Sequence, residues 1–246
     1  MKIMTLLGLI PFLVLFGCSG SSSATEAPAV GDALTLKSEQ ISFSNGQFAT
    51  ISYEYDEFGN LIGLVRDIPF VKYEYDIDAN GRIKNTSASV DGVTFRASQI
   101  FYYDSIAGLI RKDRLGFIED VGILGVAGID VFKFEGDIAT SLELRQIPFE
   151  DISINNRPDD SAGFIISTIE FEYDGERLIR ELIDENGNGI VDTQRDYTYN
   201  YDGTLSSTLG AGMSANSSVF LYEQGACNHE WGNSTHRYFC VTTDDL

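Results

Sequence analysis

The stretch Ile51-Ser52-Tyr53-Glu54-Tyr55-Asp56-Glu57-Phe58-Gly59-Asn60-Leu61-Ile62-Gly63-Leu64-Val65 decides the fold of this chain. From Ile51 to Asp56 apolar and polar residues alternate, which is the pattern of a β-strand with one buried and one solvated face. A turn that contains glycine and asparagine follows, and an aliphatic segment begins at Leu61. Strand, tight turn and strand predict a β-hairpin.

The same unit recurs along the chain, marked each time by an aromatic-x-aromatic-acidic segment. The segments are Tyr53-Glu54-Tyr55-Asp56, Tyr73-Glu74-Tyr75-Asp76, Phe101-Tyr102-Tyr103-Asp104, Phe132-Lys133-Phe134-Glu135, Phe171-Glu172-Tyr173-Asp174, Tyr199-Asn200-Tyr201-Asp202 and Phe220-Leu221-Tyr222-Glu223. We therefore predict an all-β fold, an antiparallel meander of about seven repeat hairpins. The meander must bury its aromatic face, as an open barrel, as a sandwich, as a single curved sheet, or against the glycine-rich segment 117–131.

The units resemble YD repeats, the Tyr-Asp-x-x-Gly-x-Leu pattern of Rhs-type and wall-associated proteins. Tyr55-Asp56 with Gly59 and Leu61 carries the pattern best, together with Tyr75-Asp76, Gly81 and Ile83. The resemblance spans roughly residues 50 to 225 and implies only the hairpin unit. Large Rhs proteins use hundreds of such residues to enclose a toxin, and this chain is too short for that function.

The glycine-rich segment from Gly122 to Gly128 superficially resembles a phosphate-binding loop. No Lys-Ser/Thr pair follows it, and the strand-turn-helix context of such loops is missing from the sequence pattern. We predict a strand or a loop that passes close to other backbone.

The first twenty residues resemble a bacterial lipoprotein signal peptide with its lipobox. An apolar run from Ile3 to Phe16 follows Lys2 and stops at Gly17-Cys18, with Leu15 three residues before the cysteine. The resemblance implies that the Cys18 thiol is acylated and that the protein is held on a bilayer in the bacterial cell envelope. Ser19 favours the outer membrane in that family. The alternatives are an ordinary cleaved signal peptide and an uncleaved anchor, although a run of about 14 residues is short of the roughly 20 that span a bilayer.

These features divide the chain into four parts. Residues 1–17 are the signal peptide, 18–35 a flexible Ser/Ala-rich tether, 36–225 the β-repeat domain, and 226–246 a C-terminal loop and tail. In an exported protein the pair Cys227 and Cys240 predicts a disulfide. The alternatives are a zinc site, because His229 and His236 lie between the two cysteines, or neither a disulfide nor a metal.

The charge of the chain excludes one class of partner. There are 37 acidic and 17 basic residues, so the net charge is −20, and it becomes −21 when Lys2 leaves with the signal peptide. Such a chain repels nucleic acid and anionic lipid surfaces, so we expect no nucleic-acid partner.

One segment, Asp184-Glu185-Asn186-Gly187-Asn188-Gly189-Ile190-Val191-Asp192, has the ligand spacing of a calcium loop. Side-chain oxygens would come from Asp184, Asn186, Asn188 and Asp192, and a carbonyl oxygen from Ile190. Arg195 stands where such loops place a bidentate Glu, so we expect any affinity to be weak. The alternative is an Asn-Gly hairpin turn that needs no ion. The segment 76–83 fits half of the same pattern, with Lys84 at the position of the last ligand.

The sequence offers little support for catalysis, because no nucleophile elbow is present and no carboxylate pair stands out among 37 acidic residues. We expect a non-enzymatic envelope lipoprotein that acts as an interaction or structural module and requires no cofactor. The alternatives are a calcium-dependent polysaccharide-binding module and an envelope hydrolase. An exposed row of aromatic rings would favour glycan binding, and a deep cleft with converging carboxylates would favour an enzyme.

Overall fold

The computed structural model describes residues 33–79, 81–104, 108–118, 122–136, 138–175, 177–213, 215–225 and 240–242. This part of the chain contains fifteen strands and one short 3-10 helix, η1 (Phe149–Asp151). The strands are β1 (Ala33–Phe43), β2 (Phe48–Tyr55), β3 (Leu61–Arg66), β4 (Val71–Ile77), β5 (Ile83–Ser89), β6 (Arg96–Asp104), β7 (Gly108–Ile118), β8 (Gly122–Glu135), β9 (Ile138–Gln146), β10 (Phe164–Asp174), β11 (Arg177–Asp184), β12 (Thr193–Tyr199), β13 (Leu205–Gly212), β14 (Asn216–Gly225) and β15 (Cys240–Thr242).

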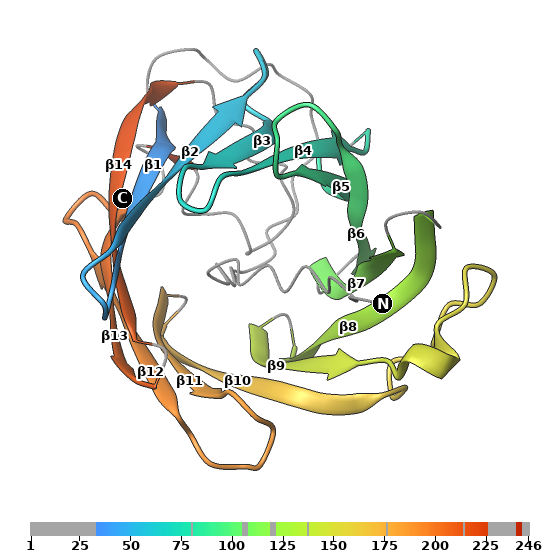
Figure 1. Cartoon of the computed structure of the whole chain (residues 1–246). Coiled ribbons are helices and arrows are strands. Elements are labelled where there is room, and N and C mark those ends of the chain that lie inside the picture. Colours follow the sequence, from blue (N-terminus) through green and yellow to red (C-terminus); the bar gives the residue numbers. More distant parts are fainter. Residues whose placement is uncertain are drawn as a thin grey trace.

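Strands β1 to β14 form a closed antiparallel barrel (Figure 1). Each strand pairs with the next in sequence, and β14 returns to pair with β1 from Ala33↔Gly225 to Phe43↔Asn216. The short strand β15 pairs with Ala33–Thr35 of β1, beyond the point where β2 begins its own pairing with β1. The predicted all-β meander is confirmed, and closure into a barrel is the way in which it buries its aromatic face.

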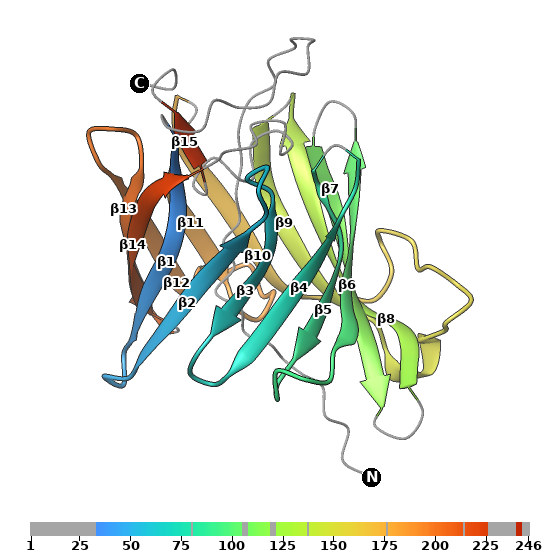
Figure 2. The ribbon, with the colours of Figure 1, turned by 90° about the horizontal axis from the view of Figure 1, so that it is seen from above.

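The connections of the barrel fall at two ends (Figure 2). The repeat turns, which follow even-numbered strands, lie at one end, which we call the repeat-turn end. The connections after odd-numbered strands lie at the other end, which we call the loop end; their described residues are 44–47, 67–70, 90–95, 147–163, 185–192, 213 and 215. Because β1 runs from the repeat-turn end to the loop end, Ala33 enters the barrel at the repeat-turn end.

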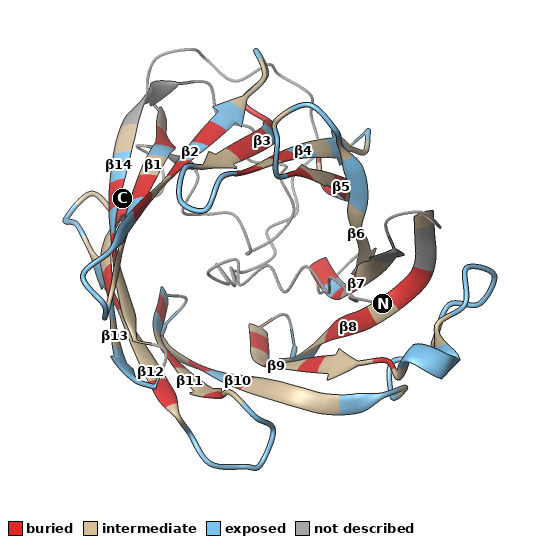
Figure 3. Ribbon diagram, in the orientation of Figure 1, coloured by how far each residue is buried: buried red, intermediate tan, exposed pale blue. Residues whose placement is uncertain are grey.

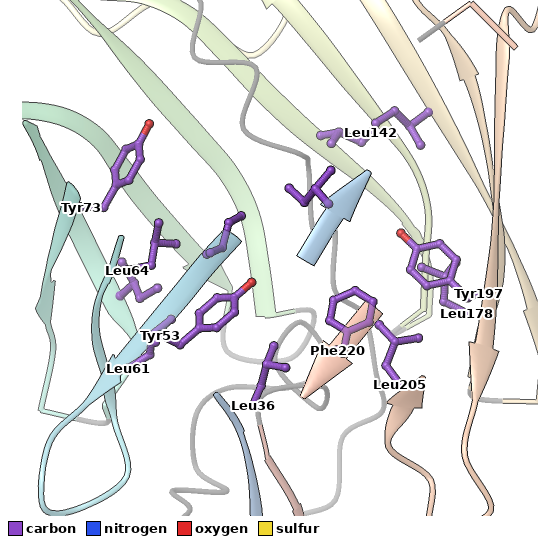
Figure 4. Close-up of a cluster of buried hydrophobic side chains, with 14 of the residues drawn as sticks. Leu36, Tyr53, Leu61, Leu64, Tyr73, Leu142, Leu178, Tyr197, Leu205 and Phe220 are labelled. Carbon is purple, nitrogen blue, oxygen red and sulfur yellow. The ribbon is translucent and has the colours of Figure 1, made fainter. Parts of the chain in front are cut away.

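The aromatic face of the repeats is covered inside the barrel (Figure 3). Figure 4 shows Tyr53, Tyr73, Tyr197 and Phe220 among the aliphatic side chains of this core. The outward residues of β2 and β4 include charged ones, such as Lys72 on β4, which lies 3.5 Å from Glu54 on β2. The alternating pattern of the sequence therefore separates a buried face from a solvated one, as predicted.

A β-bulge accompanies every repeat turn that joins two described strands. In each bulge one residue of the second strand has no pairing partner on the first strand. In the first unit Glu54 pairs with Gly63 and Tyr55 pairs with Leu61, so Ile62 is the extra residue. The extra residues are Ile62, Lys84, Ile110, Thr140, Ile179 and Ser206. The extra residue shifts the alternation of β3 by one position, so Leu61 and Leu64, three positions apart, both face the core while Ile62 stays exposed.

The seventh repeat unit is formed by β14 and β1, the last and first strands of the barrel. Tyr222 of β14 pairs with Leu36 of β1 and Leu221 pairs with Ser38, so Lys37 is the extra residue of a seventh bulge. The hydroxyl of Tyr55 donates to the carbonyl of Leu36 at 2.8 Å, and Tyr199 makes the same bond to Leu178. Strand-end tyrosines thus join neighbouring units, including the one formed by β14 and β1.

The turns show which residues of the repeat are equivalent. Asp56 accepts the N–H groups of Phe58 and Asn60, and Asp78 accepts the N–H of Arg82 in the same way. In the second unit the turn residue is therefore Asp78, and Asp76 of the predicted Tyr75-Asp76 motif lies in strand β4. In the sixth unit Tyr199 ends the strand, and Tyr201 projects fully into solvent. A motif match alone missed these shifts, because turns of different length still contain Asp and Gly.

The glycine-rich segment forms β8, and its close approach to other backbone is confirmed. Gly125 has φ of +133°, and a Cβ there would lie 2.4 Å from the carbonyl oxygen of Ser153. Ser153 belongs to the 147–163 connection, which packs on the outer wall. Arg111 fixes this connection, since it bonds Asp113 within the wall and the Pro158 carbonyl at 2.8 Å. The guanidinium of Arg157 lies 3.6 Å from the centre of the Tyr102 ring.

The interior also buries a polar group, Glu39 of β1, which is 1% exposed. Its carboxylate accepts hydrogen bonds from the hydroxyl of Ser218 at 2.5 Å and of Tyr53 at 3.1 Å. Burial raises the pKa of Glu39, and these hydrogen bonds and the charge of Arg195 offset only part of the effect. Glu181 is fully buried as well, and its pKa is also raised by burial, although Arg195 donates to it at 2.8 Å.

We predict that Glu39→Gln removes part of the pH dependence of folding. A raised pKa means that folding favours protonated Glu39, so its contribution to stability is fully present below the unfolded value of about 4.3 and is lost as pH rises through the folded value. Glutamine imitates the protonated form, so the variant should gain unfolding free energy at pH 7 to 8 relative to pH 5. Urea unfolding across this range measures the gain.

The matched control is Glu74→Gln on the solvated face of β4. A surface change of this kind should alter the unfolding free energy by about 0.5 kcal/mol or less at either pH. If the two variants respond to pH alike, Glu39 is not the buried titrating group described here.

Candidate functional site

Cys18, the predicted site of lipid attachment, lies outside the described residues. The same is true of Cys227, His229 and His236, whereas the backbone of Cys240 begins β15. Acylation, the disulfide and the alternative zinc site therefore remain predictions. In the part of the chain that the structure describes, no helix has the length and apolar character to cross a bilayer.

The predicted calcium segment connects β11 to β12 at the loop end. Asp184 ends β11, and its carboxylate accepts the backbone N–H groups of Asn186, Gly187, Asn188 and Gly189 at 2.6 to 3.2 Å. Asp192 accepts the N–H of Glu185 and the side-chain amide of Asn186, both at 3.0 Å. Both carboxylates thus accept hydrogen bonds from the same loop and hold its backbone.

These bonds set the charge state of the loop. Burial alone would raise the pKa of Asp184, but the four N–H donors outweigh it and hold the pKa below its usual value. A carboxylate that stays ionised suits both a self-capped turn and a cation site. Among the described residues no group of three or more His, Cys, Asp or Glu side chains is placed to hold a metal ion. Weak calcium binding here stays a prediction.

The second, half-matching segment has a simpler explanation. Asp78 accepts the N–H and the guanidinium Nε of Arg82, both at 2.9 Å, so it closes the repeat turn. Asp76 instead accepts the side-chain amide of Asn85 on the neighbouring strand. The resemblance to a calcium loop therefore arises from the Asx bonds of the repeat turn.

The loop end presents apolar side chains that the sequence analysis did not single out. We call them the loop-end surface: Ile68, Phe70, Val90, Val93, Ile190, Val191 and Met213, all exposed. Val93 is 82% exposed and Met213 72%. Single exposed apolar residues are ordinary, but several gathered at one end of a domain mark an interaction site.

Polar side chains fix the backbone of the loops that carry these apolar residues. Asp91 accepts the N–H groups of Thr94 and Val93 and the hydroxyl of Ser89, and these bonds lower the pKa of Asp91 below its usual range. Asn188 accepts the N–H of Ile190 in the same way at 2.8 Å. The residues predicted to bind calcium therefore also fix the position of Ile190 and Val191.

Neighbouring loops are tied together at this end. The N–H of Met213 donates to the carbonyl of Asp192 at 3.1 Å, which places Met213 beside the Ile190–Val191 tip. The ring of Phe70 packs on Gly92, in the loop that carries Val90 and Val93. A Cβ atom placed on Gly92 would lie 3.3 to 3.4 Å from that ring. The loop-end surface thus consists of two apolar groups, each built from adjacent connections. The sequence signal was the presence of aliphatic residues inside turns, where polar residues are usual.

Comparisons with known proteins give no family. No family model matches the chain, and no curated protein matches it. Similar solved structures include the TcdB2-TccC3-Cdc42 complex, with 17% identity over 67% of this chain and 7% of that chain and a TM-score of 0.32. The Tc holotoxin pore of Photorhabdus luminescens shows 16% identity over 66% of this chain and 7% of that chain, with a TM-score of 0.33. A porin-like protein from Bacteroides uniformis shows 10% identity over 81% of this chain and all of that chain, with a TM-score of 0.46. The chain thus spans only 7% of the length of the two toxin chains.

We predict that Asp184→Ala lowers the melting temperature, because four backbone N–H groups lose their acceptor. If the loop also binds calcium, millimolar calcium should raise the melting temperature of the natural chain, by an amount that follows RT ln(1 + [L]/Kd). The variant should lose that rise. Magnesium at equal ionic strength is the control for screening of the −20 charge. Equal rises with both ions would leave the loop as a self-capped turn only.

Proposed function

We propose that this protein is a lipid-anchored lipoprotein of the bacterial outer membrane. We propose further that its barrel is a non-enzymatic module that binds an envelope protein. The observation that carries this proposal is the loop-end surface, with its seven exposed apolar residues. The backbone N–H groups of two of them, Val93 and Ile190, are held by Asp91 and Asn188. Loops held by a rigid scaffold are a common way to present a binding surface. The chain enters the barrel at the repeat-turn end, so the tether and the loop-end surface lie at opposite ends.

The charge of the loop end suggests the chemistry of the partner. Asp91 and Asp192 are acidic residues of the same connections that carry Val93 and Ile190. An apolar surface with acidic neighbours fits a partner that offers apolar side chains within a basic rim.

The alternative functions find less support in the described residues. Glycan binding would be favoured by an exposed aromatic row, but the rings of Tyr53, Tyr73 and Tyr197 are at most 7% exposed. A hydrolase would be favoured by carboxylates that converge in a cleft. The buried carboxylates of Asp113, Asp130 and Glu181 are instead each paired with an arginine of a barrel strand.

For the anchor, we predict that Cys18→Ser releases the protein from membranes. The apolar run of about 14 residues is too short to span a bilayer, so acylation would supply the attachment. Fractionation of cells, with mass spectrometry of the N-terminal peptide, measures both effects. A variant that stays in the membrane pellet after a high-salt wash, together with unmodified Cys18 in the natural chain, would contradict the anchor.

For the loop-end surface, we predict that a photo-crosslinking residue at Val93 or Met213 gives discrete protein adducts in living cells. The same residue at Phe58 or Tyr201, both exposed at the repeat-turn end, is the matched control and should give few. Ile190→Asp should weaken the adducts formed from Met213, because the two residues lie in adjacent connections. Equal labelling from both ends would argue against a partner at the loop end.

A further inference from the structure

One sector of the outer wall differs from the rest in charge. Its outward side chains are Ser207, Leu209 and Ala211 on β13, Ser217, Val219 and Leu221 on β14, and Ser38, Gln40 and Ser42 on β1, and we call it the uncharged wall. Within residues 207–211, 217–221 and 38–42, Glu39 is the one charged residue, and it faces the interior. The exposed Lys37 of the β1 bulge lies at the edge of this sector. The sequence shows the same feature, since no charged residue occurs from Gly203 to Tyr222.

Charged residues bound the uncharged wall on both sides. On β12, Asp196 pairs with Arg180 at 2.6 Å, and on β2, Glu54 lies 3.5 Å from Lys72. In a chain with a net charge of −20, this sector is where a nonpolar or zwitterionic surface can approach without removing ions from water.

Three aliphatic side chains project from the uncharged wall. Leu209 is 63% exposed, Val219 61% and Leu221 56%. Val219 and Leu221 are two residues apart on one strand, and Leu209 lies diagonally across from Val219 in the antiparallel pair, about 7 Å away. They therefore form one apolar group on the face of the barrel, separate from the loop-end surface.

The path of the chain indicates what covers this group. The residues from Cys18 to Asp32 lead directly into Ala33, the first residue of β1, which is itself a strand of the uncharged wall. Fifteen residues reach at most about 50 Å when fully extended. A lipid on Cys18 would hold the barrel within that distance of a bilayer, so even a weak surface contact becomes intramolecular.

We propose that the uncharged wall rests on the lipid surface, with Leu209, Val219 and Leu221 entering the headgroup region. This rests on the proposed lipid anchor. The contact would orient the barrel with its axis along the membrane and leave the loop end open to the side. Three aliphatic side chains are too few to hold the barrel without the tether, so the contact should depend on the acylated cysteine.

The test uses the complete lipoprotein, purified with its anchor and placed in phosphatidylcholine vesicles that carry brominated acyl chains. In a Trp231→Phe background, Val219→Trp should be quenched several-fold more than Ile179→Trp, which is exposed on the charged wall beside Arg180. Adding Leu209→Ser and Leu221→Ser should reduce the quenching at position 219. The same tryptophan in Cys18→Ser protein should show little quenching.

The outcomes separate the two proposals. If the natural protein does not stay with the vesicles, the anchor fails. If it stays but positions 219 and 179 are quenched alike, the uncharged wall is not the face that meets the lipid. If position 219 is shielded without quenching, and energy transfer between copies rises with their density on the vesicle, a second copy covers the wall and the lipid contact is overturned.

Discussion

The pairing of β14 with β1 is the contact on which the rest of the structure depends. These strands are the two ends of the barrel sequence, and they meet in ten register pairs with the same bulge that the contiguous hairpins carry. Their union supplies the seventh repeat unit and removes the two open edges that a meander of fourteen strands would otherwise present. Contacts between residues so far apart in sequence are costly in chain entropy, and the repeated geometry of the other six units brings the ends together.

Closure of the barrel decides which of the alternating residues on each strand are buried. Once the sheet has an inside, Tyr53 and Tyr73 become core residues and Glu54 and Lys72 become wall residues. The bulge beside each turn uses one extra residue, so Leu61 and Leu64, three positions apart on β3, both face the core. The buried carboxylates of Glu39 and Glu181 are tolerated because hydroxyl groups and Arg195 reach them within the same interior.

The barrel also separates three surfaces by chemistry. The repeat-turn end consists of short Asx turns, the loop end presents apolar tips, and one sector of the wall lacks charge. In a strongly acidic chain, uncharged apolar groups at defined places are the positions at which contacts with other molecules cost least. The proposed partner and the proposed lipid contact use different ones of these surfaces, so both can be made together.

The sequence by itself determined the class of fold and its unit. Period-2 alternation and the recurring aromatic pairs identified the hairpins, because side chains on a strand must point to opposite faces whatever the sheet does next. It also predicted a close backbone approach in the glycine-rich segment, which the structure places at Gly125, and it offered an Asn-Gly turn at 184–192 as one of two interpretations. Tertiary structure alone decided closure, the pairing of Tyr222 with Leu36, and the outward placement of Ile190 and Met213. These depend on which strands become neighbours, and a local pattern that fits an open sheet, a sandwich and a barrel equally well cannot choose among them.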